Sequence, residues 1–275
     1  MTSPRTFVTA LAALTGLVFA DEPKVVREGD ALRPMKEAAN DAPLGDGPLN
    51  ALTPEEKAAG WQLLFDGKTP TGLRGLTKTN AFQAGWKIDT GALVLAKDLK
   101  TQGKITGGDL IANVAFEDFE FSFEWKIAVS GNSGVLYFVR GGLGQKPQGF
   151  EYQIIDDVHH PDGLKGGPLK QTGALYGILP APALAEKTVN QAGQWNEGRI
   201  VVQGAHVEHW LNGAKALEYE LGPDFVKAAL AAKVRLPPGS ERKVKSPVVL
   251  LDQGEEIAYR NLKIHPLTAT PAPLR

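Results

Sequence analysis

Apolar and polar residues alternate along many short segments of the chain. Between 119 and 127, aromatic and aliphatic residues occupy every second position, and Glu, Ser or Lys stands between them. An extended strand points successive side chains to opposite faces, so this pattern predicts strands with one apolar and one polar face. The pattern predicts strands at 61–65, 84–88, 92–96, 118–129, 134–140, 150–155, 173–178, 197–203, 206–211, 215–221, 248–252 and 257–264. Many short strands separated by Gly or Asn turns indicate an all-β sandwich or jelly roll.

Two short helices are expected to interrupt the strands. Thr53 is followed by Pro54 and, three residues on, by Glu56, which together predict a capped helix at 53–59. The segment 224–234 is Ala-rich and starts with an acidic residue, which predicts the second helix.

The two ends of the chain are not expected to belong to the fold. Arg5 precedes an apolar run at 7–19, and the run ends before Asp21, which is the pattern of a secretory signal peptide. The run is shorter than the ~20 residues of a spanning helix. We therefore expect an exported protein, periplasmic or extracellular. The expected organisation is a signal peptide at 1–20, a flexible leader with the short helix at 21–59, one domain at 60–265 and a loose tail at 266–275.

Composition narrows the classes of partner. The chain has 275 residues, 43% of them hydrophobic, which suffices for one sizeable core. A net charge of −1 gives no electrostatic basis for binding nucleic acid or an anionic membrane, so neither is expected as a partner. The absence of cysteine excludes disulfides and thiolate zinc sites.

Two strands carry polar residues that suit a sugar. Glu124 and Lys126 share the polar face of one strand, and Glu151 and Gln153 that of another. If both strands belong to one sheet, the four side chains could meet on its surface and offer the donors and acceptors that a polyol needs. Ordinary ion pairing across strands is the alternative reading. Long flanking loops favour the site, because loops of that length are uncommon without a function.

An acidic and histidine-rich segment follows the second of these strands. Its residues are of the types that bind divalent metals: Asp156, Asp157, His159, His160 and Asp162. Their spacing matches no strong metal motif, and a solvated turn is the simpler interpretation. The sequence requires no cofactor, although a divalent metal would be compatible with it.

Six stretches, in order along the chain, together resemble one known family. They are GWQLLFDGK (60–68), FEFSFEWKIAVSGNSGVLYF (119–138), GFEYQIIDD with HPDG (149–163), TGALYGILP (172–180), GQWNEGRIVVQGAHVEHWLNGAKALEYE (193–220) and LLDQGEEIAYRNLKI (250–264). The chain resembles the 3-keto-disaccharide hydrolase domain family. The resemblance implies a concanavalin-like or laminin-G-like β-sandwich (jelly roll) that acts on glycosides whose C3 hydroxyl is oxidised to a ketone. It also implies that a base removes the C2 proton, the C1 substituent leaves, and water adds.

The resemblance also assigns roles to residues. Glu151 matches the family's glutamate and is the expected base, with His209 as an acid/base or its support. The alternation nevertheless puts His209 with Val207 and Leu211 on an apolar face, where a buried, hydrogen-bonded histidine is the alternative. The expected sugar contacts, from the resemblance and from the polar strands together, are Lys126, Asn132, Gln153, Asp156, Tyr176 and Asp252.

Three positions depart from the family pattern. Gln253 stands where histidine is usual, Leu136 where lysine is expected, and Leu73 where a tryptophan usually recurs. These departures keep a second class open, a non-catalytic carbohydrate-binding module. A third alternative is an ordinary glycosidase acting on unoxidised sugar. Gln153 argues against it, because it replaces the middle carboxylate of the laminarinase-type strand motif.

Overall fold

The computed structural model describes residue 44 and residues 47–76, 85–96, 108–141, 147–231, 233–234, 236–237 and 239–267. The chain divides into two units, 1–32 and 33–275, and all described residues belong to the second. The expected signal peptide and most of the expected leader and tail lie outside the described residues. No helix in the described part is long and apolar enough to cross a membrane.

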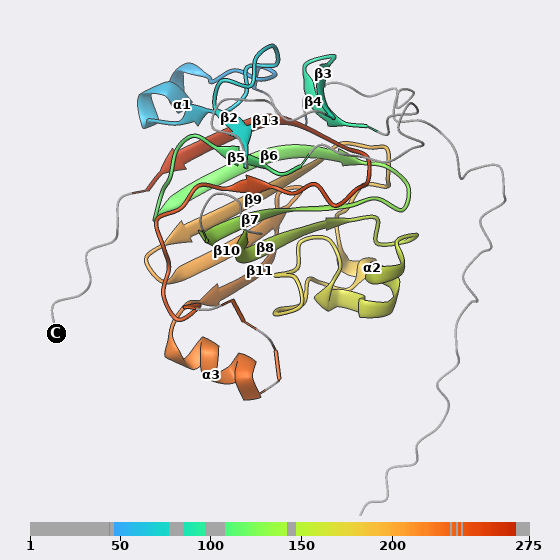
Figure 1. Cartoon of the computed structure of the whole chain (residues 1–275), viewed down its shortest axis with the longest axis vertical. Helices are drawn as coiled ribbons and strands as arrows, with labels where there is room; N and C mark the ends of the chain where they lie inside the picture. Colours follow the sequence, from blue (N-terminus) through green and yellow to red (C-terminus); the bar gives the residue numbers. More distant parts are fainter. Residues whose placement is uncertain are drawn as a thin grey trace, which may run out of the picture. The chain divides into compact units, whose positions relative to one another are not determined.

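Two antiparallel sheets form the domain, which confirms the predicted all-β sandwich (Figure 1). The larger sheet has the order β11-β10-β9-β6-β13-β4-β3, with β1 also paired to β13, and the smaller sheet has the order β2-β5-β12-β7-β8. The larger sheet consists of β1 (Gln62–Leu63), β3 (Trp86–Asp89), β4 (Ala92–Leu95), β6 (Phe119–Ile127), β9 (Asn196–Gln203), β10 (His206–Leu211), β11 (Ala214–Glu220) and β13 (Ile257–Pro266). The smaller sheet consists of β2 (Leu73–Gly75), β5 (Leu110–Ala112), β7 (Asn132–Arg140), β8 (Gln148–Ile155) and β12 (Val249–Leu250).

The strand predictions fail at three places. The segment 173–178 is not a strand: Gly173 and Gly177 have φ angles of 85° and 68°, and Leu175 makes only isolated bridges. These left-handed conformations suit glycine and break an extended run. The alternation missed β2 and β5, which are three residues long and too short to show a period.

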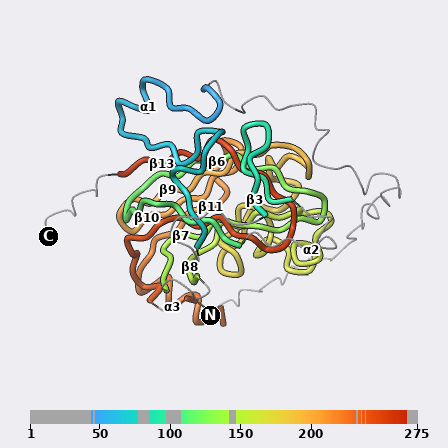
Figure 2. The backbone as a smooth tube through the Cα atoms, turned by 45° about the horizontal axis from the view of Figure 1, so that its top comes forward, coloured from blue at the N-terminus to red at the C-terminus, as the bar shows by residue number. Residues whose placement is uncertain are grey.

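The helix predictions hold with small shifts in their ends. In α1 (Pro54–Ala59), Thr53 and Glu56 form the expected capping box, with backbone-to-side-chain distances of 2.8 and 3.2 Å. Figure 2 shows this segment beside β13, to which β1 pairs. The second helix, α3, spans Pro223–Ala231. Three short helical segments were not predicted: α2 (Pro161–Gly166), η3 (Gly167–Leu169) and η4 (Leu184–Glu186).

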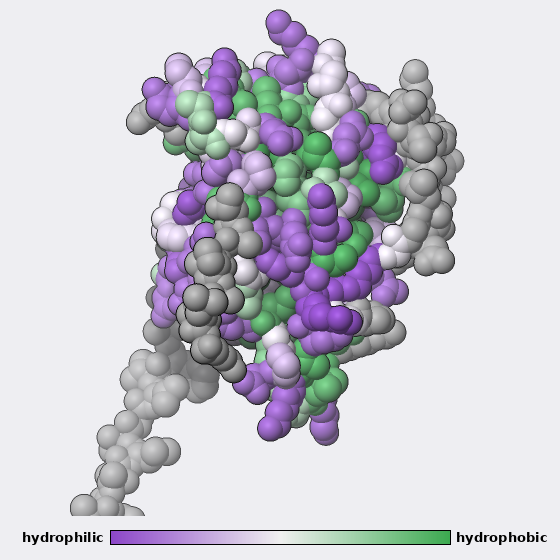
Figure 3. Space-filling model, turned by 90° about the vertical axis from the view of Figure 1, so that its left-hand side faces the viewer, coloured by the Kyte–Doolittle hydropathy of each residue, from purple (hydrophilic) through white to green (hydrophobic). Residues whose placement is uncertain are grey.

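The apolar faces of the strands meet between the two sheets. Phe121 and Phe123 of β6 are fully buried, as are Phe150 and Tyr152 of β8. The rings of Phe123 and Tyr152 meet edge to face across the gap, with centroids 5.4 Å apart, a preferred aromatic geometry. Because the core takes every second side chain, the polar ones point to the two outer faces. Hydrophilic side chains are interspersed with hydrophobic ones on the face drawn in Figure 3.

Several polar contacts cross the core and tie the sheets together. The Ser133 hydroxyl lies 2.8 Å from the Tyr259 hydroxyl, and the Tyr152 hydroxyl donates to the Trp210 carbonyl at 2.9 Å. The Tyr137 hydroxyl lies 2.8 Å from Nε2 of His209. Buried polar groups that are satisfied in this way fix the mutual position of the sheets.

His209 is enclosed in this core. Its Nδ1 lies 3.0 Å from the Gly173 carbonyl oxygen, which can only accept, so Nδ1 carries the proton and Nε2 accepts from Tyr137. Tyr219 continues the chain of hydrogen bonds, its hydroxyl 2.9 Å from that of Tyr137. Burial lowers the pKa of His209 to about 4. The ring is therefore neutral at physiological pH.

We predict that His209 makes the fold sensitive to acid. An unfolded histidine has a pKa of ~6.5, so below that pH the unfolded chain binds a proton that the folded chain refuses until about pH 4. The stabilisation from neutral His209 is complete above ~6.5 and is lost as the pH falls through the folded pKa. Between about pH 7.5 and about pH 5 the loss is roughly 2 kcal/mol.

Urea unfolding at these two pH values would measure the effect. The control is His209→Gln, which keeps hydrogen-bonding capacity without titrating. Between the two pH values, the free energy of unfolding of this variant should fall by roughly 2 kcal/mol less than that of the wild type. Equal pH dependence in the two proteins would contradict the assignment.

Candidate functional site

A pocket of about 680 Å³ opens on the outer face of the smaller sheet. Its floor includes Glu151 of β8 and Leu136 of β7, which are direct cross-strand partners. The segment after β12 supplies one side, with Leu251, Asp252 and Gln253. Pockets of this volume are typical of small-molecule sites. Because strands β7 and β8 are extended and paired, they hold the floor residues on a rigid surface.

Side-chain amides hold the Glu151 carboxylate. Gln253 Nε2 lies 3.2 Å from Glu151 Oε1, and Gln253 Oε1 accepts from Asn132 Nδ2 at 3.1 Å. Turned so that its nitrogen faces these groups, the Gln153 amide donates to the Ser133 carbonyl at 3.0 Å and to Glu151 Oε1 at 3.1 Å. The carboxylate is therefore oriented by two neutral donors, and no lysine or arginine lines the pocket among the described residues.

Gly134 of β7 makes room for this carboxylate. It pairs with Gln153 in the β7–β8 register, so a side chain at 134 would share the outer face with Glu151. A Cβ at this position would lie 2.5 Å from Glu151 Oε1 and 2.9 Å from its Cγ. The glycine is therefore required by the close approach of the glutamate.

Asp252 and Tyr176 lie at the edges of this region. The Asp252 carboxylate accepts from Gly108 N at 2.5 Å and from Gly254 N at 2.9 Å, so it shapes the rim. The Tyr176 backbone N–H donates to the Glu151 carbonyl at 3.0 Å, and its hydroxyl donates to Asp162 at 2.6 Å. Burial and the bond to Asp162 raise the pKa of Tyr176, so its phenol stays protonated at neutral pH.

Lys170 contacts both Asp162 and Tyr176 and was not identified from the sequence. Its Nζ lies 2.6 Å from Asp162 Oδ1 and 5.4 Å from the centre of the Tyr176 ring. It follows η3 in a loop, where no period marks it. Gln253 was noted only as a departure from the family, although its amide contacts both Asn132 and Glu151.

Lys126 does not join Glu151. The sequence allowed both to lie on one sheet, but β6 belongs to the larger sheet and β8 to the smaller one. Lys126 lies on the outer face of the larger sheet, with Nζ 4.8 Å from the centre of the Trp195 ring. The expectation that Glu124, Lys126, Glu151 and Gln153 meet is therefore wrong.

His209 is also absent from the pocket. It is fully buried between the sheets and bonded through both ring nitrogens, as its apolar neighbours Val207 and Leu211 suggested. An expected acid/base role in contact with a sugar does not fit this position. Any influence on Glu151 would pass through the packing of the sheets.

Asp156 serves the turn that follows β8. Its carboxylate accepts from Ser130 N at 2.8 Å and lies 2.8 Å from His159 Nδ1. The neighbouring Asp157 forms an ion pair with Lys187 at 2.7 Å, with both side chains almost fully buried. The expected solvated turn is wrong at these two positions, and the expected sugar contact of Asp156 is replaced by protein donors.

The described residues contain one cluster with metal-type ligands, His206, Glu208 and Glu218, within 4.8 Å of one another. Lys215 Nζ lies 2.6 Å from Glu208 and 2.7 Å from Glu218, so an ammonium group already neutralises these acids. This cluster is on the larger sheet, away from the Glu151 pocket.

Comparisons with known proteins agree on the kind of domain. Residues 60–265 match the family model described as a 3-keto-alpha-glucoside-1,2-lyase-like domain. A protein of Bacteroides thetaiotaomicron named 3-keto-disaccharide hydrolase is 28% identical over 240 residues, covering 78% of this chain and 81% of that protein. Two solved structures of candidate glycosyl hydrolases from Parabacteroides distasonis have TM-scores of 0.67 and 0.57 at 29% and 26% identity. They cover 80% and 75% of this chain and 100% and 99% of their own.

We predict that Gly134→Ala displaces the Glu151 carboxylate without unfolding the domain. The three atoms nearest to the new methyl group all belong to the side chain of Glu151, which must rotate away from Gln253. The free energy of unfolding should change by less than about 1 kcal/mol. Crystallography of the variant and thermal unfolding measure the two effects.

The matched control is Gly222→Ala, where a Cβ meets nothing within 4 Å. This control should leave both the Glu151 position and stability unchanged. A Gly134→Ala structure with Glu151 in its original place would contradict the role given to the glycine.

Proposed function

Because the chain belongs to the family of 3-keto-alpha-glucoside-1,2-lyase-like domains, we propose that it cleaves 3-keto-glycosides in the Glu151 pocket. The observation that carries the proposal is the Glu151 carboxylate, held by the amides of Gln253 and Gln153 at the floor of a pocket of about 680 Å³. A fixed carboxylate facing a ligand-sized space is what proton abstraction from a sugar carbon requires.

The proposed reaction balances without an oxidant. The C3 ketone acidifies the C2–H bond, and Glu151 takes this proton while the electron pair forms an enolate. The ketone re-forms, the C1–O bond breaks, and the proton now held on Glu151 is available to the departing oxygen. Water then adds across C1 and C2, hydroxyl to C1 and hydrogen to C2. The products are a 3-keto sugar and the released alcohol.

The neutral amides fit this chemistry. Asn132 and Gln253 are oriented by their mutual hydrogen bond, and their remaining donors suit the developing enolate oxygen.

Two of the three departures from the family pattern adjoin this base. Leu136 lies directly opposite Glu151 in the β7–β8 register, and Gln253 contacts its carboxylate. Where the resemblance expects lysine and histidine, this chain therefore offers apolar surface and an amide. These replacements keep the non-catalytic module as the second candidate, which binds sugar without releasing an aglycone. Whether a divalent metal assists is part of the same test.

We predict that Glu151→Gln lowers the rate on a 3-keto nitrophenyl glucoside by ~10²–10⁴-fold, because the amide cannot take the proton. Release of nitrophenol measures the rate. The matched control is Glu186→Gln, an exposed glutamate of η4, which should leave the rate unchanged.

The unoxidised nitrophenyl glucoside and a chelator complete the experiment. Release from the keto substrate alone supports the proposal, and its loss with chelator would add a metal. Binding of either sugar without release would favour the module. Release from both substrates at similar rates would indicate an ordinary glycosidase and overturn the proposal.

We also propose that the protein is exported. The support is the sequence pattern of Arg5, the apolar run at 7–19 and the break before Asp21. Expression of the full chain in a Gram-negative host, followed by N-terminal sequencing of the protein from the periplasm, should give a mature chain beginning near Asp21. An uncleaved chain retained in the cytoplasm would contradict this.

A further inference from the structure

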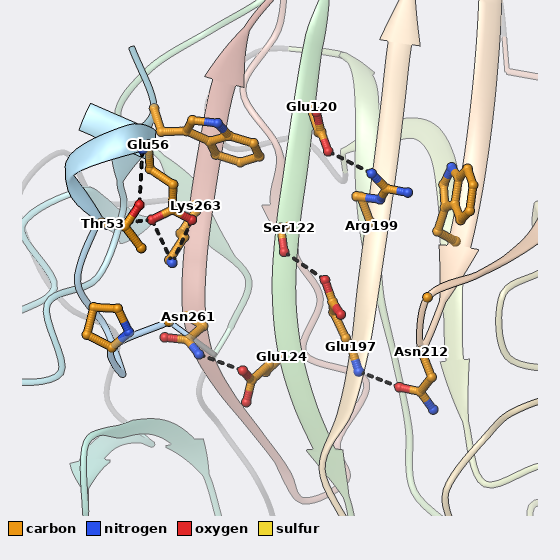
Figure 4. Close-up of a pocket in the computed structure, with 15 residues that line it drawn as sticks. Thr53, Glu56, Glu120, Ser122, Glu124, Glu197, Arg199, Asn212, Asn261 and Lys263 are labelled. Atoms are coloured by element: carbon orange, nitrogen blue, oxygen red, sulfur yellow. Dashed lines mark hydrogen bonds and ion pairs between the residues drawn. The ribbon is translucent and has the colours of Figure 1, made fainter. Parts of the chain in front are cut away.

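A second pocket lies on the outer face of the larger sheet. It has a volume of about 390 Å³, and its floor is made by side chains of β13, β6 and β9 (Figure 4). The segment around α1 lines one side, and Asn212 and Gly213 of the β10–β11 turn line another. Since the two sheets share one core, this pocket and the Glu151 pocket open on opposite faces of the sandwich.

The charges in this pocket are arranged in pairs. Arg199 lies 3.0 Å from Glu120, and Lys263 lies 2.9 Å from Glu56. On the same face, Arg260 lies 2.7 Å from Glu124, its cross-strand partner. Among the described residues that line this space, each cationic group thus already has a carboxylate partner. An anionic ligand would have to break one of these pairs, so the pairs favour a ligand without negative charge.

Glu197 adds an acid with spare capacity to accept. It stands directly opposite Glu124 in the β6–β9 register, and the Ser122 hydroxyl lies 3.4 Å from its carboxylate. Burial raises the pKa of Glu197, with the neighbouring Glu124 and Glu120 charges adding to the shift. Asn212 and Asn261 line the same space, where Asn212 Oδ1 accepts from Glu197 N and Asn261 Nδ2 donates to Glu124 Oε1, as Figure 4 shows. Such a mixture of acceptors and donors on rigid strands matches the hydroxyls of a sugar.

Two tryptophans complete the lining. Trp61 directly precedes β1 and stacks on His265 with ring centroids 5.2 Å apart. Trp210 is in β10, and the Arg199 guanidinium lies 4.2 Å from the centre of its ring. Four strand spacings of ~4.8 Å separate β1 from β10 in the order β1-β13-β6-β9-β10. The two tryptophans are therefore about 19 Å apart across the sheet. Rigid aromatic side chains at this separation suit a chain of sugars rather than a single ring.

We propose that this pocket is a second, non-catalytic carbohydrate site that binds a neutral oligosaccharide. It lies on the face opposite the proposed active site and needs no ketone in its ligand. An enzyme with such a site would hold a longer glycan on one face while it cleaves an oxidised sugar on the other. Binding at this second site does not require the cleavage reaction in the Glu151 pocket.

The test uses the indole N–H signals of ¹⁵N-labelled full-length protein, one from each of the five tryptophans. Trp61→Phe and Trp210→Phe assign the two that line the pocket. Unoxidised cellohexaose and maltohexaose are the probes, each titrated to about 10 mM, which would largely saturate a site of millimolar Kd. At least one of them should shift both pocket signals, in the wild type and in Glu151→Gln alike.

A blocking variant separates this site from the active site. Ser122→Phe fills the floor from a half-buried outer position, so the fold should persist, which circular dichroism would check. This variant should bind the hexaose with a Kd at least about tenfold higher than the wild type does. It should still cleave the 3-keto nitrophenyl glucoside at the wild-type rate. If the wild type does not cleave the 3-keto glucoside but its Trp61 and Trp210 signals still shift, the proposed function is refuted and the second site is not.

Two results would overturn the second site. One is that neither hexaose moves the Trp61 and Trp210 signals. The other is that the shifts survive in Ser122→Phe or vanish in Glu151→Gln, which would place the sugar in the Glu151 pocket instead.

Discussion

Every functional feature of this domain depends on the alternation of side chains along paired strands. The shared core takes Phe121 and Phe123 from β6 and Tyr152 from β8, and it thereby forces their polar neighbours onto the outer faces. A slip of one residue in β8 would bury Glu151 and expose Tyr152, so the hydrophobic effect fixes the register. The same constraint creates two separate polar surfaces, one on each sheet.

The candidate active site shows how a sheet surface becomes a pocket. Glu151 can approach β7 closely because Gly134 has no Cβ, and the amides of Gln153 and Gln253 then orient its carboxylate. The polar contacts across the core, such as Ser133 to Tyr259, hold β7 against the larger sheet. Rigid strands thus fix the carboxylate more firmly than a loop would. The surrounding loops supply the rim, through Asp252 and the segment that follows β12.

Local patterns predicted the fold better than they predicted the site. The alternation located most strands, and the capping residues Thr53 and Glu56 located α1, because these signals act over a few residues. Glu151 and Gln153 were identified as a pair for the same reason. Lys126 was placed with them wrongly, since the assignment of a strand to a sheet depends on long-range pairing that a single sequence does not reveal. Lys170 and the close approach at Gly134 also needed the three-dimensional structure.

The central claim is that Glu151 removes the C2 proton of a 3-keto sugar. The most direct measurement is cleavage of a 3-keto glucoside in D₂O, with the released sugar examined by NMR at early times against an enzyme-free control. The account predicts deuterium at C2 of the product with the wild type and neither release nor C2 exchange with Glu151→Gln. Release of a product that retains its original C2 hydrogen would contradict it, because the glycosidic bond would then have broken without an enolate.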